Sequence, residues 1–367
     1  MTDKDIQIPF YIKAAIFCVG LIAFVTILYV ALDIIIPIVF SVIIAILLNP
    51  LVNYLVKFKI NRVIAILIVI VFTTSIIVAL GGLLVSRSIR FSESWPLLVE
   101  RFTELLNQAI KWTSKYFNIR QQNIHAWIAQ TKGELISMSG AAIGQTLVAV
   151  GNWIVLVMLI PVYTFLILFY QSIIREFIAR LFKKDSQSKV REIITQTKVV
   201  IQKYLTGLII ETVLVALMQI ITLLALGIEY AILLGVIGAL LNLIPYIGGI
   251  VAVALPMMIA IATKSTAWYA VYVLIIYYFI QLVDNNYIVP KIVASKVKIN
   301  ALFSIIVVIA GNALWGIPGM FLSIPLLAIV KLIFDNIESL SPWGFLLGDT
   351  MPSLLKIKPI FHKKIKK

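Results

Sequence analysis

The residues that could do chemistry in this chain are a few carboxyl and amide side chains within long apolar stretches. Glu211 lies about two turns into one stretch, and Asp284 ends another beside Gln281 and Asn285. A carboxylate in membrane hydrocarbon is costly unless it is paired, hydrated or protonated. Glu211 is therefore a candidate carrier of a proton or cation, and the oxygens around Asp284 could coordinate a small hard cation or hydrogen-bond a hydroxylated solute. The structural alternatives are a polar interface for Glu211 and a helix-ending cluster that fixes the next connector for Asp284.

Two further apolar segments, Ala231–Thr263 and Ala301–Phe334, are each interrupted near the middle by asparagine, proline and glycine. Proline removes a backbone donor, and lipid offers no replacement hydrogen bond. Such breaks survive where protein or a watery cavity lines them, as at the midplane sites of secondary transporters. Asn242 and Asn312 occupy corresponding places in the two segments and could contact a substrate, and Tyr246 could line its path or pack against protein. The residues expected to shape the site are Pro245, Gly248, Gly316, Pro318 and Gly319.

Composition assigns the chain to the polytopic membrane proteins. Of its 367 residues, 62% are hydrophobic and only 13% are charged, and the mean hydropathy is +1.06. A water-soluble domain of this length does not have such a composition. The net charge of +15 would suggest nucleic acid in a soluble chain, but here Lys and Arg gather between and after apolar spans, as the positive-inside rule expects. We predict an all-α membrane protein with no nucleic-acid partner.

The sequence carries no motif that would indicate an enzyme. His125 and His362 lie outside the predicted spans, and the chain contains no HExxH pair, GxSxG turn or GxxxxGK[ST] loop. The single Cys18 excludes an intrachain disulfide and a thiolate metal cluster. We therefore expect no catalytic residue, no cofactor and no metal site. Transport would be passive or coupled to an ion.

Hydropathy indicates about eight membrane segments, of which two are the broken segments. The first span is expected to remain as a helix and not to be cleaved. In the second span, Pro37 and Asn49-Pro50 predict a kink or an early end. The unbroken spans are predicted at Ala14–Leu32, Ile34–Leu55, Val63–Val85, Thr146–Tyr170, Tyr204–Leu226 and about Thr266–Val283.

Charge predicts which connectors lie inside the cell. Basic residues gather at Lys57–Arg62, after the second span, and between the fourth and fifth spans, where Lys and Arg outnumber the acids. By the positive-inside rule both connectors are cytoplasmic. The N-terminus and the basic tail, residues 338–367, are then also inside, and the segment Ser86–Gln145 is outside.

The two broken segments are compatible with two topologies. If each crosses the membrane once, the connector Val283–Asn300 with its lysines lies outside, whereas re-entrant hairpins of two half-helices place it inside. The positive-inside preference favours the hairpins. A span and hairpin over Tyr204–Thr263 would then repeat, in opposite orientation, as a span and hairpin over Thr266–Phe334. Such an inverted repeat is a common plan among transporters.

The remaining segments are predicted to be amphipathic helices. One extends around Trp95–Ile110 and a second around Ile124–Ile136, and both could form a structural cap or an oligomer interface. The basic stretches Ile173–Phe182 and Val190–Ile201 are expected to contact anionic lipid headgroups. The chain thus divides into residues 1–85 with three membrane helices, the extracytoplasmic segment 86–145, the fourth helix and basic cytoplasmic linker 146–203, the transport core 204–337, and the tail 338–367.

Four ordered motifs give the chain a family resemblance. They are Tyr204-Leu-Thr-Gly207, Asn242-Leu-Ile-Pro245-Tyr-Ile-Gly248, Gln281-Leu-Val-Asp284-Asn285-Asn286-Tyr-Ile-Val-Pro290, and Gly316-Ile-Pro318-Gly319-Met-Phe-Leu-Ser-Ile-Pro325. In this order and at these separations the chain resembles the autoinducer-2 exporter family of bacterial membrane proteins over nearly its whole length. The resemblance implies an inner-membrane carrier that exports the furanone-derived quorum signal or exchanges sodium or lithium for protons. One departure is Gly249, where many relatives carry proline.

These observations predict a secondary transporter, expected to be a homo-oligomer with cytoplasmic termini in the bacterial inner membrane. Its first-choice substrate is a small polar solute such as the autoinducer-2 signal, moved out of the cell. The alternative is monovalent cation and proton antiport, in which Glu211 and Asp284 would be the carriers. A membrane scaffold without flux is a third hypothesis, but a scaffold has no need for intramembrane breaks that are costly in lipid.

Overall fold

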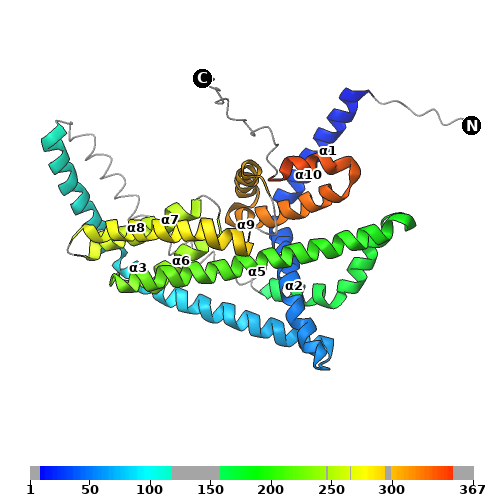
Figure 1. Ribbon diagram of the computed structural model, residues 1–367, viewed down its shortest axis with the longest axis horizontal. Helices are drawn as coiled ribbons and strands as arrows, with labels where there is room; N and C mark the ends of the chain where they lie inside the picture. The colour runs from blue at the N-terminus through cyan, green and yellow to red at the C-terminus, as the bar shows by residue number, and fades with distance from the viewer. Residues whose placement is uncertain (1–8, 118–157, 245–246, 265, 294–298, 350–367) are drawn as a thin grey trace, which may run out of the picture.

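The computed structural model describes residues 9–117, 158–244, 247–264, 266–293 and 299–349. Every regular element in these ranges is helical (Figure 1). In the N-terminal half the helices are α1 (Phe10–Val30), α2 (Leu32–Lys57), α3 (Arg62–Phe117) and a helix that covers Met158–Arg180. In the C-terminal half they are α5 (Gln187–Ala225), α6 (Ala231–Asn242), α7 (Ile247–Thr263), α8 (Trp268–Val283), a π-helix (Asp284–Val293), α9 (Ala301–Asn336) and α10 (Ser341–Leu347), with short 3₁₀ turns at Lys184–Ser186 and Glu338–Leu340.

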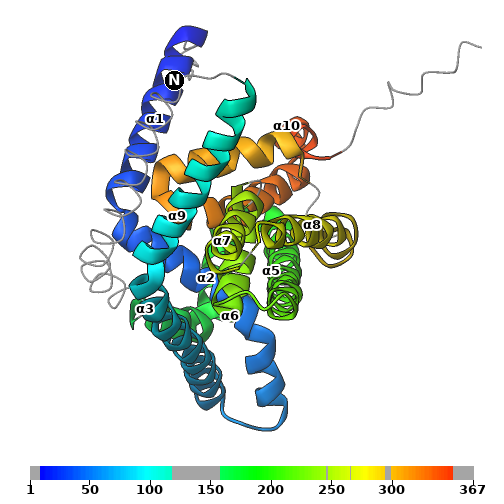
Figure 2. The same cartoon turned by 90° about the vertical axis from the view of Figure 1, so that its left-hand side faces the viewer.

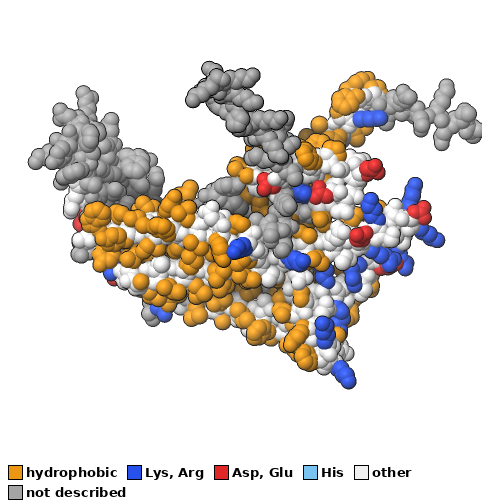
Figure 3. Space-filling model, viewed as in Figure 1, with side chains coloured by type: hydrophobic (Ala, Val, Ile, Leu, Met, Phe, Trp, Pro, Cys, Tyr) orange, Lys and Arg blue, Asp and Glu red, His pale blue; other side chains and the backbone are white. Residues whose placement is uncertain are grey.

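The protein is an all-α polytopic membrane protein, as predicted. Within the described ranges, 7 helices are long and apolar enough to cross a membrane. α1 buries none of its residues, and apolar side chains cover much of the outer surface (Figure 3). An apolar exterior of this extent suits a surrounding of lipid and not of water.

α2 excludes one of the two outcomes expected at its prolines, a kink or an early end. The helix continues through Pro37 and Pro50 to Lys57, so it does not end early. Proline removes one backbone hydrogen bond, but Leu48 and Val52, on either side of Pro50, belong to a packed cluster with α3 and the helix Met158–Arg180. Side-chain packing thus maintains the helix where one backbone bond is missing.

Two helices extend well beyond their predicted spans. α3 continues from the third span into the segment 86–117 as one helix, and α5 joins the basic stretch 190–201 to the fifth span. Hydropathy marks the part of a helix that fits lipid, not the point where the helix ends. Lys and Arg side chains gather near the α2–α3 turn and the start of α5 (Figure 3). The expected helix at 124–136 and residues 146–157 of the fourth span lie outside the described residues.

The first broken segment is a hairpin of two short antiparallel helices. α6 and α7 have 12 and 17 residues, and each is shorter than the roughly 20 residues that a crossing requires. A Cβ added at Gly248 would overlap the backbone carbonyl of Leu241, and one at Gly238 would lie 3.5 Å from the Cβ of Ala252. In each pair, the two residues are about equally far along the chain from residue 245, as an antiparallel hairpin requires.

The second broken segment folds back on itself within α9. Gly316 has a φ of 63° and a ψ of −142°, a conformation that residues with a Cβ rarely adopt. The Ser323 hydroxyl donates to the Val307 carbonyl at 2.8 Å, and a Cβ at Gly319 would overlap the Gly311 carbonyl. In each contact, the two residues are equally far along the chain from residue 315. α9 is therefore two antiparallel arms joined at Gly316 (Figure 2) and not one straight crossing.

α5 runs antiparallel to α8 and the π-helix. Near the start of the apolar part of α5, a Cβ at Gly207 would lie 2.5 Å from the Ile292 carbonyl oxygen of the π-helix. Farther along, Val215 clusters with Ile280, and Leu223 clusters with Val273. The order of span and hairpin, and the opposite directions of α5 and α8, are those that the inverted-repeat hypothesis requires. The symmetry of the repeat stays a prediction.

Close contact between the arms of α9 makes Gly319 a sensitive position. Gly319→Val should lower the free energy of unfolding by at least about 2 kcal/mol, because the new side chain would meet the backbone of Gly311. The measurement is unfolding in detergent followed by circular dichroism. Gly82→Val in α3 is the control, since a Cβ at Gly82 has nothing within 4 Å, and its stability should stay near that of the wild type. Equal losses in both variants would contradict the hairpin.

Candidate functional site

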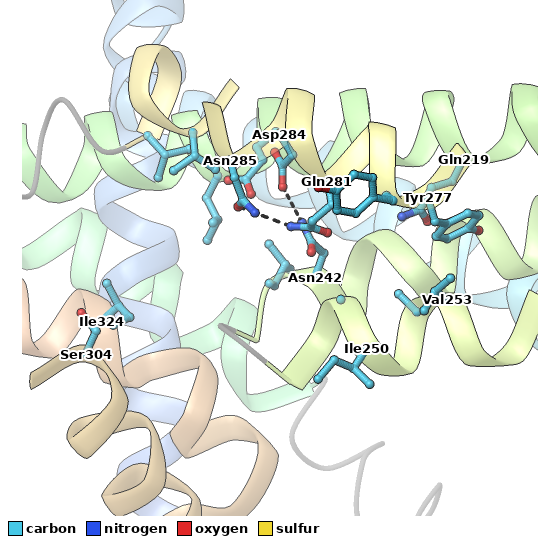
Figure 4. Close-up of a pocket in the computed structure, with 18 of the residues that line it drawn as sticks. Gln219, Asn242, Ile250, Val253, Tyr277, Gln281, Asp284, Asn285, Ser304 and Ile324 are labelled. Atoms are coloured by element: carbon cyan, nitrogen blue, oxygen red, sulfur yellow. Dashed lines mark hydrogen bonds between the residues drawn. The ribbon is translucent and has the colours of Figure 1, made fainter. Parts of the chain in front are cut away.

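A cavity of about 820 Å³ lies between α5, the α6–α7 hairpin, α8, the π-helix and the arms of α9 (Figure 4). Its polar lining comes mainly from α5, the end of α6 and the junction of α8 with the π-helix. The second hairpin contributes only Ser304 and Ile324. The polar side chains that line the cavity are those of Tyr204, Glu211, Gln219, Asn242, Tyr277, Tyr278, Gln281, Asp284, Asn285 and Ser304.

The cavity wall includes two buried acidic side chains. Glu211 on α5 is 6% exposed and Asp284 at the start of the π-helix is 2% exposed, and their carboxyl groups interact electrostatically. In the described part of the chain neither acid has a Lys or Arg partner, because the ion pairs there involve other residues. Burying a carboxylate without a cationic partner is costly. A proton, a cation or a polar ligand is needed to stabilise this pair.

Asn242 connects the two irregular parts of the core. It is the last residue of α6, immediately before the break, and its Nδ2 donates to Oδ2 of Asp284 at 2.9 Å (Figure 4). Asp284 itself marks the point where α8 widens into the π-helix. There, Asn286 Nδ2 donates to the Leu282 carbonyl at 2.9 Å, and Pro290 lacks the N–H that an α-helix would use. The hydrogen bond between Asn242 and Asp284 thus joins the end of α6 to the start of the π-helix.

Three buried atoms of the lining lack a hydrogen-bond partner within the described structure. They are Oε1 of Gln219, the hydroxyl of Tyr277 and Oδ1 of Asp284. Each of these residues is at least nine-tenths buried. A buried polar atom without a partner costs about 1–3 kcal/mol. These atoms could be satisfied by water or by a ligand that carries hydroxyl or amide groups.

Sequence reasoning missed Gln219 and Tyr277, although the sequence contains a signal for Gln219. The buried residues of α5 include Gly207, Glu211, Val215, Gln219 and Leu223, one at every fourth position. Residues at this spacing share one face of a helix. A second polar residue two turns after Glu211 therefore faces the same side. For Tyr277 the sequence offers no comparable signal, because α8 carries several tyrosines and only packing shows which one faces inward.

The predicted site residues divide into three groups. Glu211, Asn242, Gln281, Asp284 and Asn285 come together in the cavity, where Gln281 Nε2 also donates to Asn285 Oδ1 at 3.4 Å. Gly249 lines it too, and a Cβ there would lie 3.2 Å from Gln281 Oε1.

Gly248, Gly316 and Gly319 shape the hairpins and do not line the cavity. Gly248 allows close contact between α6 and α7. Gly316 forms the turn between the α9 arms and Gly319 allows their close contact, and Pro318 lies between these two glycines in the chain.

Asn312 does not join Asn242. It is exposed on the first arm of α9 and is not part of the cavity wall, so the structure does not bring the two asparagines together. Substrate contact by Asn312 stays a prediction. Corresponding positions in two hairpins need not face the same space, because the rotation of each arm is set by its own contacts. Pro245 and Tyr246 lie outside the described residues.

Comparison with known protein families agrees with the fold. The sequence profile described as AI-2E family transporter matches residues 18–339, which is most of the chain. The chain belongs to the AI-2E family. All four motifs and the whole cavity of this AI-2E protein lie within the matched range.

The individual relatives of this AI-2E protein are distant. YrrI of Bacillus subtilis, which has a provisional name as a transport protein, is 24% identical over 66% of this chain and 68% of its own. YueF of the same organism, with a similar name, is 33% identical over 31% of this chain and 30% of its own. The AI-2 transport protein TqsA of Escherichia coli is 31% identical over 34% of this chain and 36% of its own. The chain thus spans only about a third of YueF and of TqsA.

The hydrogen bond between Asn242 and Asp284 should couple the two residues energetically. In a double-mutant cycle with Asn242→Ala and Asp284→Ala, we expect a coupling energy of about 1–3 kcal/mol in detergent unfolding. The control cycle combines Asp284→Ala with Asn286→Ala in place of Asn242→Ala, because Asn286 is exposed and its side chain donates to the Leu282 carbonyl of α8. Coupling near zero in both cycles would show that the bond does not contribute to the folded state.

Proposed function

We propose that this AI-2E family protein is a secondary transporter that carries a small polar solute out of the cell. The observation that carries the proposal is the cavity of about 820 Å³ in the core of a membrane protein, lined by polar side chains from α5, α6, α8 and the π-helix. Membrane proteins rarely place such groups in their interior unless a substrate or ion contacts them. Family membership supports transport, and the cavity supports a solute larger than a bare ion.

The lining favours a substrate that carries hydroxyl groups. Oε1 of Gln219 and Oδ1 of Asp284 can only accept hydrogen bonds unless the acid is protonated, whereas the Tyr277 hydroxyl can donate or accept. Hydroxyl groups of a bound molecule could satisfy these atoms, while Val253, Leu274 and Ile250 offer apolar contact to its carbon skeleton. Cavities of about 300–1,000 Å³ suit small organic ligands. The furanone-derived autoinducer-2 signal, which the name of TqsA gives as what that protein transports, is such a molecule.

Both hairpins are proposed to be re-entrant, with the cavity near the membrane midplane. α6, with 12 residues, is too short to cross, α7, with 17, is at the lower limit for a crossing, and the α9 arms turn back at Gly316. Relative movement of the hairpins and of α5 with α8 would open the cavity to each side in turn. We further propose that the protein lies in the bacterial inner membrane with both termini in the cytoplasm. The chain would divide at the boundaries predicted from its sequence, and the functional state would be a homo-oligomer.

Antiport of a monovalent cation and protons is the second candidate, supported by a separate observation. Glu211 and Asp284 are buried together without a Lys or Arg partner in the described structure. Two neighbouring carboxyl groups of this kind can exchange a proton for a small cation, because either species compensates the buried charge. The same pair could instead couple proton movement to solute export, so the two candidates differ in what else crosses the membrane.

Replacing the unpartnered groups should separate transport from stability. In Gln219→Met/Tyr277→Phe we expect efflux of the furanone-derived signal from loaded proteoliposomes to fall at least about tenfold, because about 1.4 kcal/mol of lost substrate contact is sufficient. The Tm without substrate should not fall, because the variant removes buried polar atoms that lack partners. Tyr272→Phe, at an exposed tyrosine of α8 outside the cavity, is the control. If wild-type proteoliposomes release the signal no faster than protein-free vesicles do, the proposal of solute export is wrong.

Proton flux decides whether antiport is the better description. Internal pH is followed in proteoliposomes while sodium, lithium or potassium is added outside. If solute export is the activity, no cation changes the internal pH. Cation-dependent alkalinisation that is lost in Glu211→Gln and kept in Glu229→Gln would establish antiport instead. Glu229 is a suitable control because it is an exposed acid just beyond α5.

A further inference from the structure

Three basic side chains from separate helices interact at the end of the molecule opposite the α6–α7 hairpin. Arg62 begins α3, Arg175 lies on the helix Met158–Arg180, and Lys198 lies on α5 before the apolar part of that helix. The start of α3 packs against the helix Met158–Arg180 through Ala65, Ile66 and Leu168. Arg175 lines a crevice with Ile194 and Thr195, about one turn before Lys198 on α5. Three like charges therefore lie in one region and act on one another. Lys and Arg side chains are abundant at this end of the molecule (Figure 3). Repulsion between them must be compensated.

Glu176, the acid next to Arg175 in the chain, is already engaged. Glu176 holds Arg180 and Arg191, each at 2.9 Å. The Nη2 atom of Arg62 is buried and has no hydrogen-bond partner in the described structure. Arg62 is moreover in the first turn of α3, which contains no acidic residue. The positive end of the helix dipole adds to the positive potential there. An anion is the missing partner that this arrangement would stabilise.

The surroundings point to a phospholipid as the source of that anion. Ile173 and Phe177 on the helix that carries Arg175 are 64% and 61% exposed, and Val199, next to Lys198, is 40% exposed. A phosphate group held by the cations would place acyl chains against such apolar side chains. Between this helix and α5 lies a crevice of about 240 Å³, lined in part by Arg175 and Ser172.

We propose that Arg62, Arg175 and Lys198 together bind the phosphate group of an anionic phospholipid at the basic edge of the membrane region. Guanidinium groups bind phosphate with paired hydrogen bonds, and the lysine adds a point charge. The site is separate from the transport cavity, and the inference does not rest on the proposed substrate. It assigns these three cations a ligand, beyond the general attraction of basic segments to lipid headgroups.

The test compares lipids and charge-matched variants of the full-length protein in neutral detergent. Phosphatidylglycerol or phosphatidylcholine is titrated, and binding is measured by native mass spectrometry and by Tm. Wild-type protein should bind phosphatidylglycerol and gain stability, and Arg62→Gln/Lys198→Gln should weaken that binding at least about tenfold. Lys57→Gln/Lys189→Gln removes the same charge from exposed positions on α2 and α5 and should change binding less than about twofold.

A second readout distinguishes a binding site from a structural role. Without lipid, Arg62→Gln/Lys198→Gln should have a Tm equal to or above that of the wild type, because repulsion is relieved. A lower Tm with an unchanged phosphatidylglycerol response would overturn the proposal, as would equal binding of phosphatidylcholine. In a third arm, inorganic phosphate is compared with chloride at equal ionic strength. A response to inorganic phosphate without one to phosphatidylglycerol would overturn the lipid assignment in favour of a soluble anion.

Discussion

The need to satisfy backbone groups where no water is available governs this structure. Proline and glycine interrupt two apolar segments, and each interruption leaves carbonyl and amide groups that lipid cannot accept. The fold pairs the two arms of each segment, so that protein lies beside each interruption, and in α9 the Ser323 hydroxyl donates to the Val307 carbonyl of the facing arm. Glycines make that pairing possible, because at Gly248 and Gly319 a side chain would collide with the facing backbone. The hairpins therefore depend on close backbone contact more than on large apolar side chains.

Pairing the arms also determines where polar side chains can lie. α6 ends at Asn242 because its hairpin turns there, and α8 changes to a π-helix at Asp284. The 2.9 Å bond between these residues joins two places where regular helix stops. Irregular helix geometry releases backbone groups and redirects side chains, which is why π-helical turns are frequent at functional sites. Glu211 reaches the same space from α5, whose direction opposite to α8 brings its midpoint beside that junction.

Much of this arrangement could be predicted from the sequence, because polar residues in apolar stretches have few places to go. The class, both breaks and the grouping of Glu211, Asn242 and Asp284 follow from that cost. Helix lengths could not be predicted: the basic start of α5 continues the membrane helix, and hydropathy detects only the lipid-facing part. The rotation of a helix about its axis could not be predicted either. For that reason Tyr277 was missed, and the sequence did not show that Asn312 lies apart from the cavity that Asn242 lines.

The unpartnered atoms of the cavity connect stability with transport. Gln219, Tyr277 and Asp284 are buried polar groups whose free energy improves when a ligand or water supplies hydrogen bonds. Any ligand that satisfies them stabilises the arrangement of α5, α6 and α8 that encloses it. In the proposed transport cycle, a second arrangement, open to the other side of the membrane, can compete with this one only if it satisfies the same ligand about equally well. This requirement favours movement of the hairpins and helices around an intact polar cluster over movement that takes the cluster apart, because each separated group would again be buried without a partner.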